Sequence, residues 1–566
     1  MSGPHAAQAH GALPQLPSPE APPQPGIPPA AYDPRMGGAL VWLVDIEAAR
    51  DGGTLPQAGR PHAAAAHGAH PPEFRPAGGL ETIRVSDLGW HGALPYPPLL
   101  VGGPDIERRV ALAPGAADTF AWGIVSLASP GLVPGTALEG RDTALRRLRV
   151  RAGLQGWDAT RGLITDPPAS GLIDVFNGIG MTWRARDGGA EVPLRDPSAW
   201  LDAPIGIRRY LGTGGSEGPA ELAGQPWPIV RGGSALAPVR SCGTQLLDSL
   251  TQLYRWSDRG TVTALYEDGA PVYTSAGLVP DCATAGSPGA GRYYHDAKGQ
   301  VRLGSPPQGV ITVDGYSGGF LAALVLRDLL RETLALPAGM LDEGSVIATA
   351  ASVPYAGGWA WTGRETAREA IQPLLAALGA RLVASRSGGL RLWPLRALTA
   401  SARPVALLDP ASAVSVVPVP LDAPLVPPAA AWTVGYGRTH VTTTTPKPSV
   451  SAEERARLEQ PYRTAPWADP ANLTRYAQAS RPDVVETALL QRADALAMAA
   501  ALGGLWGVPR TLWQVTMPTA SALLREIGDV VSLAWPADGL RAGRLGQVVG
   551  DSIRAGADEA SLLILV

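Results

Sequence analysis

Short runs in which apolar and polar residues alternate dominate the first half of the chain. Up to about residue 225 the runs are "ALVWLVDIE", "ETIRVSDLGW", "IERRVALA", "FAWGIVSLA", "LRRLRVRAG" and "MTWRARDGG". Their two-residue period is that of half-buried strands, and glycine and proline separate them. The pattern predicts small antiparallel sheets or barrels. A second β group follows, in which "GTVTALYEDGAPVY" predicts a hairpin about Glu267-Asp268-Gly269.

Two later segments have a helical period. In the segment 320–336 one helical face holds a stripe of apolar residues that Pro337 ends: Ala322, Leu326, Leu329, Leu330 and Leu334. The next helix is predicted to begin at Thr362, where Glu365 completes a capping box, and to end at Gly379. We expect Pro373 to kink this second helix.

The rest of the chain predicts a hairpin, a polar stretch, a third helix and a terminal β region. "ARLVAS" and "LRLWPL" flank the turn "RSGG", so a hairpin completes a small α+β unit. A polar stretch over 437–475 precedes a helix predicted over 482–502, with Ser480 as its cap and Gly503-Gly504 as its stop. Four β-rich runs after residue 510 predict a terminal meander or barrel.

These patterns predict a multidomain, mainly β chain with α+β insertions, built from several small antiparallel β-barrels or sandwiches plus a helix-containing α+β domain. The abundance of glycine (68) and proline (56), which interrupt long elements, agrees with this fold class. The predicted organisation is a Pro-rich extended arm (1–37), N-terminal β domains (38–225), a second β domain (226–315), an α+β domain (316–400), a linker or irregular segment with β (401–475), and a helix plus C-terminal β-barrel-like domain (476–566).

Charge and cysteine content exclude several classes of protein. The formal net charge is -3, Lys298 and Lys447 are the only lysines, and no basic run interleaved with aromatic residues occurs. A surface that neutralises many phosphates of a nucleic acid is therefore not expected. Cys242 and Cys282 are too few for a disulfide framework or a four-thiolate zinc site, although a single bond between them is possible. No secretory signal and no membrane-spanning segment are expected.

One motif has the form of a catalytic site. Gly315, Ser317 and Gly319 satisfy G-x-S-x-G, the nucleophile elbow of many hydrolases, between a predicted strand and a predicted helix. Such an enzyme also needs an acid and then a histidine further along the chain, and His440 is the only histidine after Ser317. We therefore expect a tight turn, in which Gly315, Gly318 and Gly319 bend the backbone and Ser317 caps the helix.

Two other patterns resemble binding sites only superficially. His62, His67 and His70 could approach one metal, but their spacing matches no standard ligand helix, so an exposed loop over 61–72 is expected. The glycine-rich "YLGTGGSEG" lacks the lysine of a phosphate-binding loop and is expected to be an ordinary loop.

Pairs of acidic residues are the remaining chemical candidates. Asp202 with Glu217, or Asp342 with Glu343, could serve as glycosidase acids only if the fold held the two carboxyl groups about 5 to 9 Å apart. The sequence offers no support for either spacing. We assign no catalytic, cofactor-binding or metal-binding residue.

The order of the motifs carries a resemblance. "ALVWLVDIE", "IERRVALAP" and "WGIVSLASP" are followed by "YLGTGGSEGPAELAGQPWPIVRG", "YYHDAKGQVRLGSPPQGVITVDG", "WTVGYGRTH", an alanine-rich helix and "IGDVVSLAWPADGLRAG". Over residues 38–566 this order resembles the tail-tip or baseplate hub proteins of long-tailed bacteriophages and prophages. The N-terminal arm and the loop at 61–72 fall outside the resemblance.

The resemblance implies a non-enzymatic structural protein of the virion tail tip, made in the host cytoplasm. It would form a homotrimer that closes the tail tube, with the distal tail ring, the tape measure and receptor-binding or fibre proteins as partners, and DNA only in transit. Two alternatives stay open: a tail-associated cell-wall hydrolase, and a carbohydrate-binding host adhesin.

Overall fold

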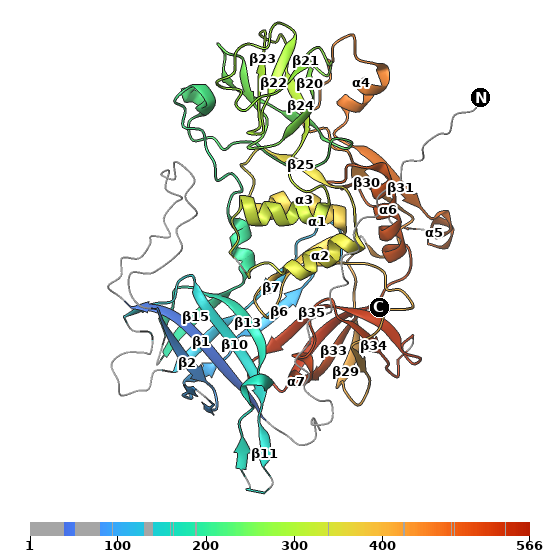
Figure 1. Ribbon diagram of the computed structural model, residues 1–566. Helices are drawn as coiled ribbons and strands as arrows, with labels where there is room; N and C mark the ends of the chain where they lie inside the picture. The colour runs from blue at the N-terminus through green and yellow to red at the C-terminus, as the bar shows by residue number, and fades with distance from the viewer. Residues whose placement is uncertain are drawn as a thin grey trace, which may run out of the picture.

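The computed structural model describes residues 39–50, 80–128 and 138–566, apart from positions 93, 139, 159, 162, 187–188, 338, 423–424, 477, 480 and 538. The arm at 1–37, the three histidines at 62, 67 and 70, and the expected cap Ser480 lie outside the described residues. The fold is mainly β with several antiparallel sheets and a few helices, as the sequence predicts. Figure 1 shows two β lobes at the bottom, a helical layer above them and a further β lobe at the top.

A nine-stranded sheet forms the first lobe, with the order β2-β1-β10-β13-β15-β8-β5 and with β9 and β14 beside it. The bounds are β1 Leu40–Arg50, β2 Leu80–Ser86, β5 Leu100–Gly102, β8 Ile124–Ala128, β9 Arg141–Asp142, β10 Arg146–Leu154, β13 Ile173–Gly180, β14 Arg184–Arg186 and β15 Gly189–Arg195. Two small hairpins, β3 Trp90–His91 with β4 Pro95–Tyr96 and β11 Gly156–Asp158 with β12 Leu163–Thr165, extend from it.

Alternation along β1 explains both faces of this sheet. Val44 and Ile46 lie opposite Val150 and Leu148 of β10, and all four are fully buried or nearly so. Asp45, between them, points to the other face, where it forms ion pairs with arginines of two neighbouring strands, Arg84 and Arg151. The predicted period of two is therefore confirmed here, because successive side chains of a strand leave on opposite faces.

The top lobe holds two sheets around the buried Trp256. One comprises β17 Val239–Gly243, β24 Ile311–Tyr316 and β20 Thr261–Glu267, and the other β18 Gln245–Asp248, β19 Leu253–Arg255, β23 Gln300–Leu303, β22 Arg292–His295 and β21 Thr274–Leu278. The predicted turn about Glu267-Asp268-Gly269 is present, because Glu267 and Ala270 exchange backbone hydrogen bonds across it. The expected hairpin does not continue beyond this turn, since β20 pairs with β24. The Glu267 carboxylate instead accepts the N–H groups of Gln308 and Gly309, which holds the chain from 308 to 310 beside the turn.

The helical layer joins the lobes. It contains α1 Ala322–Asp328 with a π-helical turn at Leu329–Thr333, α2 Glu343–Ser352, α3 Ala367–Leu378, and the hairpin β26 Ala380–Ala384 with β27 Leu390–Pro394. A two-stranded pairing of β16 Ile229–Gly232 with β25 Gly358–Trp361 links the layer to the top lobe. Gly379 ends α3 in the left-handed conformation, as predicted.

The predicted start of α3 is wrong by one turn. Its capping box is Thr366 with Glu369, and not Thr362 with Glu365. Glu365 does accept hydrogen bonds from Thr362, but its own carbonyl accepts the N–H of Ile205, and this pairing holds the chain outside the helix until Thr366.

The third predicted helix begins ten residues later than expected. The segment holds β30 Ala431–Tyr436, α4 Ala452–Glu459, β31 Arg463–Ala468, α5 Pro470–Arg475, β32 Val485–Glu486 and α6 Arg492–Trp506. Residues 485–486 pair in parallel with β30, so they are not helical. The predicted stop at Gly503-Gly504 is wrong, because α6 continues to Trp506. Glycine at 503 makes room for the ring of Trp467, since a Cβ there would lie 2.2 Å from it.

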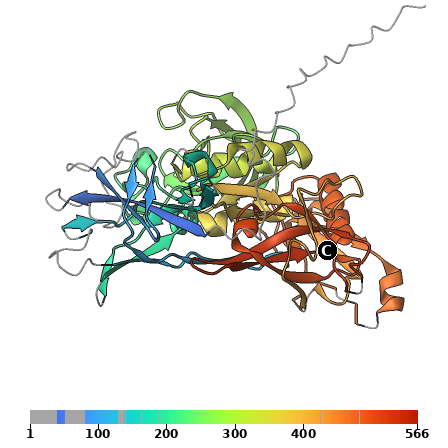
Figure 2. The same ribbon diagram turned by 90° about the horizontal axis from the view of Figure 1, so that it is seen from below.

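The last lobe is an eight-stranded sheet to which both ends of the chain contribute. Its main path is β28-β34-β35-β36-β33-β29, and the N-terminal β6 and β7 join at β35. The bounds are β6 Asp105–Arg109, β7 Thr119–Ala121, β28 Ala406–Leu408, β29 Ser415–Val419, β33 Leu512–Pro518, β34 Val530–Leu533, β35 Arg544–Arg554 and β36 Glu559–Leu565, with the short α7 Thr519–Ala522. Seen from below, the two lower lobes lie side by side and the helices cover one side (Figure 2).

Candidate functional site: a buried arginine–carboxylate junction

An opposite-charge pair lies at the centre of the contact between β6 and β35. The antiparallel register sets Arg108 directly opposite Asp551, and both side chains are inaccessible to solvent. Arg108 donates from Nε to Asp551 Oδ1 at 2.9 Å, and its Nη2 contacts Oδ2 of the same carboxylate. This two-point contact joins residues 443 positions apart in the chain.

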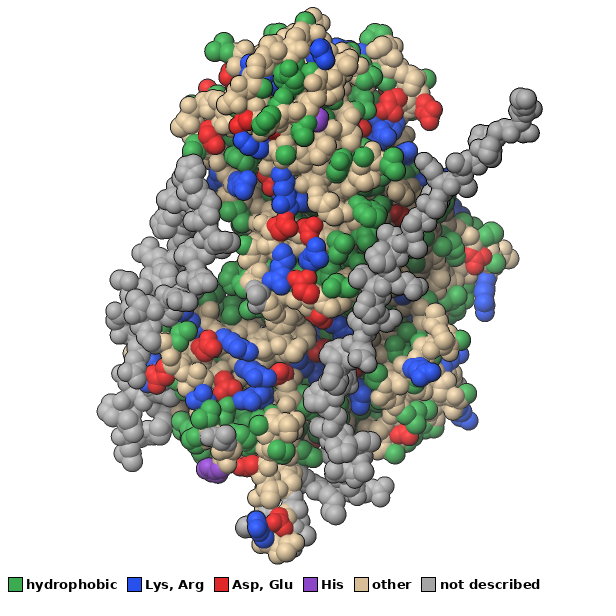
Figure 3. Space-filling view, in the orientation of Figure 1, with side chains coloured by type: hydrophobic (Ala, Val, Ile, Leu, Met, Phe, Trp, Pro, Cys, Tyr) green, Lys and Arg blue, Asp and Glu red, His purple; other side chains and the backbone are tan. Residues whose placement is uncertain are grey.

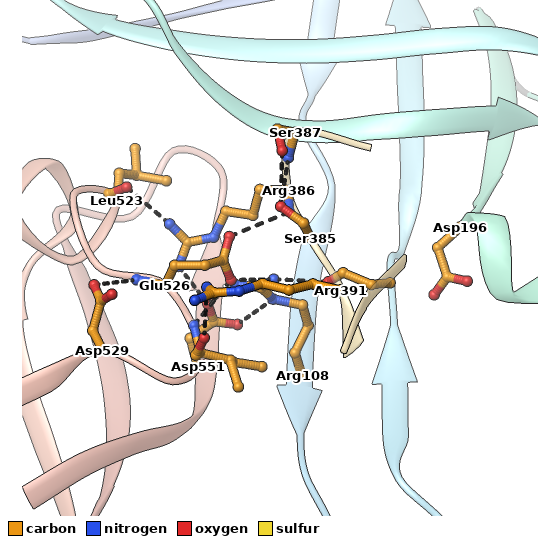
Figure 4. A network of polar contacts seen from close by, with 12 residues as sticks. Arg108, Asp196, Ser385, Arg386, Ser387, Arg391, Leu523, Glu526, Asp529 and Asp551 are labelled. Carbon is orange, nitrogen blue, oxygen red and sulfur yellow. Dashed lines mark hydrogen bonds and ion pairs between the residues drawn. The ribbon is translucent and has the colours of Figure 1, made fainter. Parts of the chain in front are cut away.

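The turn of the β26–β27 hairpin and the loop before β34 complete the cluster (Figure 4). Arg386, in that turn, donates to Asp551 and also to the carbonyl of Leu523 at 2.9 Å. Arg108 Nη1 donates to the carbonyl of Ala384 at 3.0 Å and pairs with Glu526 at 2.6 Å. We call Arg108, Arg386, Glu526 and Asp551 the junction, because they join β6, the β26–β27 hairpin and β35.

Burial alone would raise the pKa of Asp551, but the charges of Arg108 and Arg386 and their hydrogen bonds outweigh it and lower the pKa to about 2. Burial would likewise lower the pKa of Arg108, yet the carboxylates of Asp551 and Glu526 raise it above its usual value. Asp551 therefore stays ionised and Arg108 keeps its proton at neutral pH. Neither is suited to proton transfer, so the junction is suited to holding three elements together.

A second buried arginine joins the top lobe to the helical layer. Arg231 on β16 donates to both oxygens of Asp258, at 2.6 and 2.7 Å, and to the hydroxyl of Thr333 at 3.2 Å. Burial would raise the pKa of Asp258, but Arg231 outweighs it and lowers the pKa. In Arg108–Asp551 and in Arg231–Asp258 the planar guanidinium matches a carboxylate at two points.

Ser317 is not positioned as a nucleophile. It is buried, and its backbone N–H and carbonyl both bond to Gly232, so it extends the strand pairing past β24. The expectation that it caps the helix is wrong, because Leu321 occupies the cap position of α1. Gly318 bends the backbone as expected, with a φ of +78°. Gly315 does not bend it but lies within β24, where a Cβ would lie 2.5 Å from the Trp256 ring.

His440 makes structural contacts with Trp359 and Ala360. It is half-buried and packs against Trp359, with ring centroids 5.0 Å apart, and its Nε2 accepts the N–H of Ala360. Burial, helped by Arg438, lowers its pKa to about 3.

The other sequence candidates have structural partners. Asp202 pairs with Arg195 and Arg368 on the surface. Glu217 accepts the N–H of Leu211 within the glycine-rich loop. Asp342 caps α2, and its neighbour Glu343 pairs with Arg331.

The two cysteines, Cys242 and Cys282, are both free and buried. Within the described ranges, no group of three or more histidine, cysteine, aspartate or glutamate side chains could hold a metal ion. None of the helices in the described part of the chain has the length and apolar character needed to cross a bilayer.

No protein-family model and no curated protein matches this chain. Among solved structures, a chain of the virion of a native gene transfer agent particle is similar, with 17% identity, a TM-score of 0.35, and coverage of 60% of this chain and 84% of that one. The tail protein from Neisseria meningitidis MC58 has 13% identity and a TM-score of 0.30, covering 82% and 97%. The 43 kDa tail protein of prophage MuSo2 from Shewanella oneidensis has 9% identity and a TM-score of 0.32, covering 84% and 97%. Scores at this level do not establish a shared fold, and no role passes from those proteins to this chain through them.

Sequence reasoning missed the junction, although a signal is present. Ile106, Arg108 and Val110 share one face of an alternating run, as do Val549, Asp551 and Ile553 of another. An arginine on the apolar face of one strand and an aspartate on the apolar face of another are candidates for a buried pair, because an isolated buried charge is too costly.

Proposed function

We propose that this chain is a structural virion protein, a tail-tip or baseplate hub component that closes the tail tube, connects it to receptor-binding parts and supports host attachment and genome passage. The observation that carries the proposal is the eight-stranded sheet that N-terminal and C-terminal strands share, with a buried junction across it. The chain then acts as one rigid frame, which a part that transmits force between a tube and its fibres requires. The order of sequence motifs described above gives further support.

The surface suits assembly and passage of DNA. Strands β2 and β5 end the first sheet, and β28 and β29 end the main path of the last one. A strand at the end of a sheet is where another chain can add a strand, so these are the proposed contacts between copies of a homotrimer.

On the face drawn in Figure 3 basic and acidic side chains lie interspersed, and the formal net charge is -3. Such a surface would not retain passing DNA.

Imaging of labelled particles tests the proposal. An N-terminal tag that binds gold is placed on this chain, and the same tag on a head protein of the same particle serves as the control. We expect the gold at the tail tip. The hub assignment would be refuted if the gold lay along the tube or on the head, or if intact particles carried none.

Light scattering of the purified chain tests the oligomeric state. It should give the mass of a trimer, and a stable monomer at micromolar concentration would refute the trimer.

A further inference from the structure

A small pocket lies where the top lobe, the β30–β31 hairpin and the start of α6 meet. Its volume is about 190 Å³, and four segments line it: Leu236, Ala237, Pro238 and Arg240; Gly437 and Arg438; Arg463; and Leu490 with Gln491. Three of these residues are arginines and none is acidic. The pocket is separate from the junction, and its Gly437 and Arg438 come from the segment "WTVGYGRTH" quoted above.

The three arginines differ in how their charge is balanced. Arg240 lies 3.7 Å from the carboxylate of Asp314, and Arg438 pairs with Glu486 at 2.7 Å. Arg463 is exposed and lies over the ring of Tyr436, 5.0 Å from its centroid. Two of the arginines are thus held in place by carboxylates, and the third is positioned by an aromatic ring. Glu454 interacts electrostatically with Arg463 but forms its ion pair with Arg457, so the Arg463 guanidinium can still donate to a ligand.

We propose that this pocket binds a carboxylate of an acidic peptide segment on a partner protein. Arginine is the side chain best suited to this ligand, because its planar fork matches the two oxygens of a carboxylate. Gln491 is the N-cap residue of α6, so the positive end of this helix dipole lies at the same wall. The inference does not depend on the tail-tip assignment.

Size and surroundings favour a peptide over a nucleic acid. Pockets for whole small molecules usually occupy roughly 300 to 1,000 Å³, so a pocket of about 190 Å³ takes a single group such as one acidic side chain. Leu236, which is 98% exposed, lies at the pocket and offers an apolar contact to a neighbouring residue of the peptide. A nucleic acid would need further basic groups along a track, because its affinity comes from neutralising many phosphates.

Fluorescence anisotropy on the full chain tests the proposal with two labelled peptides, Leu-Asp-Leu-Glu and its amide counterpart Leu-Asn-Leu-Gln. The variant is Arg463→Gln, and the control is Arg541→Gln, an exposed arginine outside the pocket. We expect the acidic peptide to bind at least about tenfold more tightly than the amide peptide, and Arg463→Gln to weaken the acidic peptide by about tenfold or more, since a hydrogen bond to a charged group contributes that much. Arg541→Gln should leave binding within about twofold, as expected of a surface site outside contact range.

Further measurements distinguish a peptide carboxylate from a phosphate or a nucleic acid as the ligand of the pocket. Arg463→Lys keeps the charge without the fork and should bind with intermediate affinity, while inorganic phosphate should compete with the peptide. Equal binding of the two peptides, or unchanged binding by Arg463→Gln with a native circular dichroism spectrum, would overturn the proposal. It would also be overturned if phosphate bound and the acidic peptide did not, or if a thymidine octamer bound more tightly than the acidic peptide.

Discussion

Replacing Asp551 by asparagine is the most direct test of the junction. The substitution keeps the shape of the side chain but removes the negative charge between Arg108 and Arg386, which are almost completely buried. Two guanidinium groups would then lie in the interior. Glu526 would remain as the carboxylate of the junction, and it forms an ion pair with Arg108 but accepts only the backbone N–H of Arg386. The contact between β6 and β35 should therefore be the first part of the fold to weaken.

Two estimates give the expected loss of unfolding free energy in Asp551→Asn. Removing one partner of a buried ion pair costs about 3 to 5 kcal/mol, because the other charge is left unpaired. The pKa of Asp551 is about 2 in the folded protein against an ordinary 3.8, and at about 1.4 kcal/mol per pKa unit its ionisation contributes roughly 2 to 3 kcal/mol to the free energy of unfolding at neutral pH. We therefore expect a loss of about 3 kcal/mol, roughly a hundredfold change in a local opening equilibrium.

The sign of the pH dependence follows from the lowered pKa. This contribution is complete above the unfolded-state pKa and is lost as the pH falls through the folded-state pKa, so the wild type should lose it between about pH 4 and pH 2. The free energy of unfolding of Asp551→Asn lacks this contribution at every pH. The difference in stability between the two proteins should therefore shrink across this interval.

Hydrogen exchange measured by mass spectrometry is the assay, because it follows the peptides that contain β6 and β35 separately from the rest of the chain. Asp202→Asn is the matched control, since it removes a carboxylate from exposed ion pairs and should cost less than about 1 kcal/mol. A double-mutant cycle with Arg386→Gln should give a coupling of about 0.5 to 3 kcal/mol. Exchange in β6 and β35 that is no faster in Asp551→Asn than in Asp202→Asn would refute the reasoning.

Three further predictions concern the top lobe and its contacts. Gly315→Ala should lower the free energy of unfolding in urea by about 1 to 3 kcal/mol, because the new Cβ would lie 2.5 Å from the Trp256 ring. Ser317→Ala should leave any release of fragments from cell-wall material at the level of the wild type, since Ser317 is buried within a backbone pairing. The ring of His440 should stay neutral at pH 5 by NMR, because its pKa is about 3, and its contribution to stability should be full above pH 6.5 and lost as the pH falls toward 3.

A specific result would contradict each of these three predictions. An unchanged urea midpoint for Gly315→Ala would show that the ring of Trp256 can move aside. Fragment release that disappears in Ser317→Ala, while the fold is intact, would favour the cell-wall hydrolase over the structural role. A protonated His440 at pH 5 would show that water reaches its ring.

Local patterns were sufficient where structure depends on neighbours in the chain. Strand β1 follows from the alternation around Asp45, and the end of α3 follows from Gly379. These features depend on backbone geometry over a few residues, since the strand period and the left-handed turn arise within that range. The sequence could therefore determine the mainly β class and the turn after Gly315.

Tertiary structure alone decided which strands meet. Arg108 and Asp551 are separated by 443 residues, and nothing local to either indicates that their strands are neighbours. The same holds for the start of α6, where pairing of residues 485–486 with β30 overrides the helical pattern, and for Arg463, which lines a pocket with residues from three other segments. Pairing depends on the fit between two surfaces, and each sequence pattern describes only one of them.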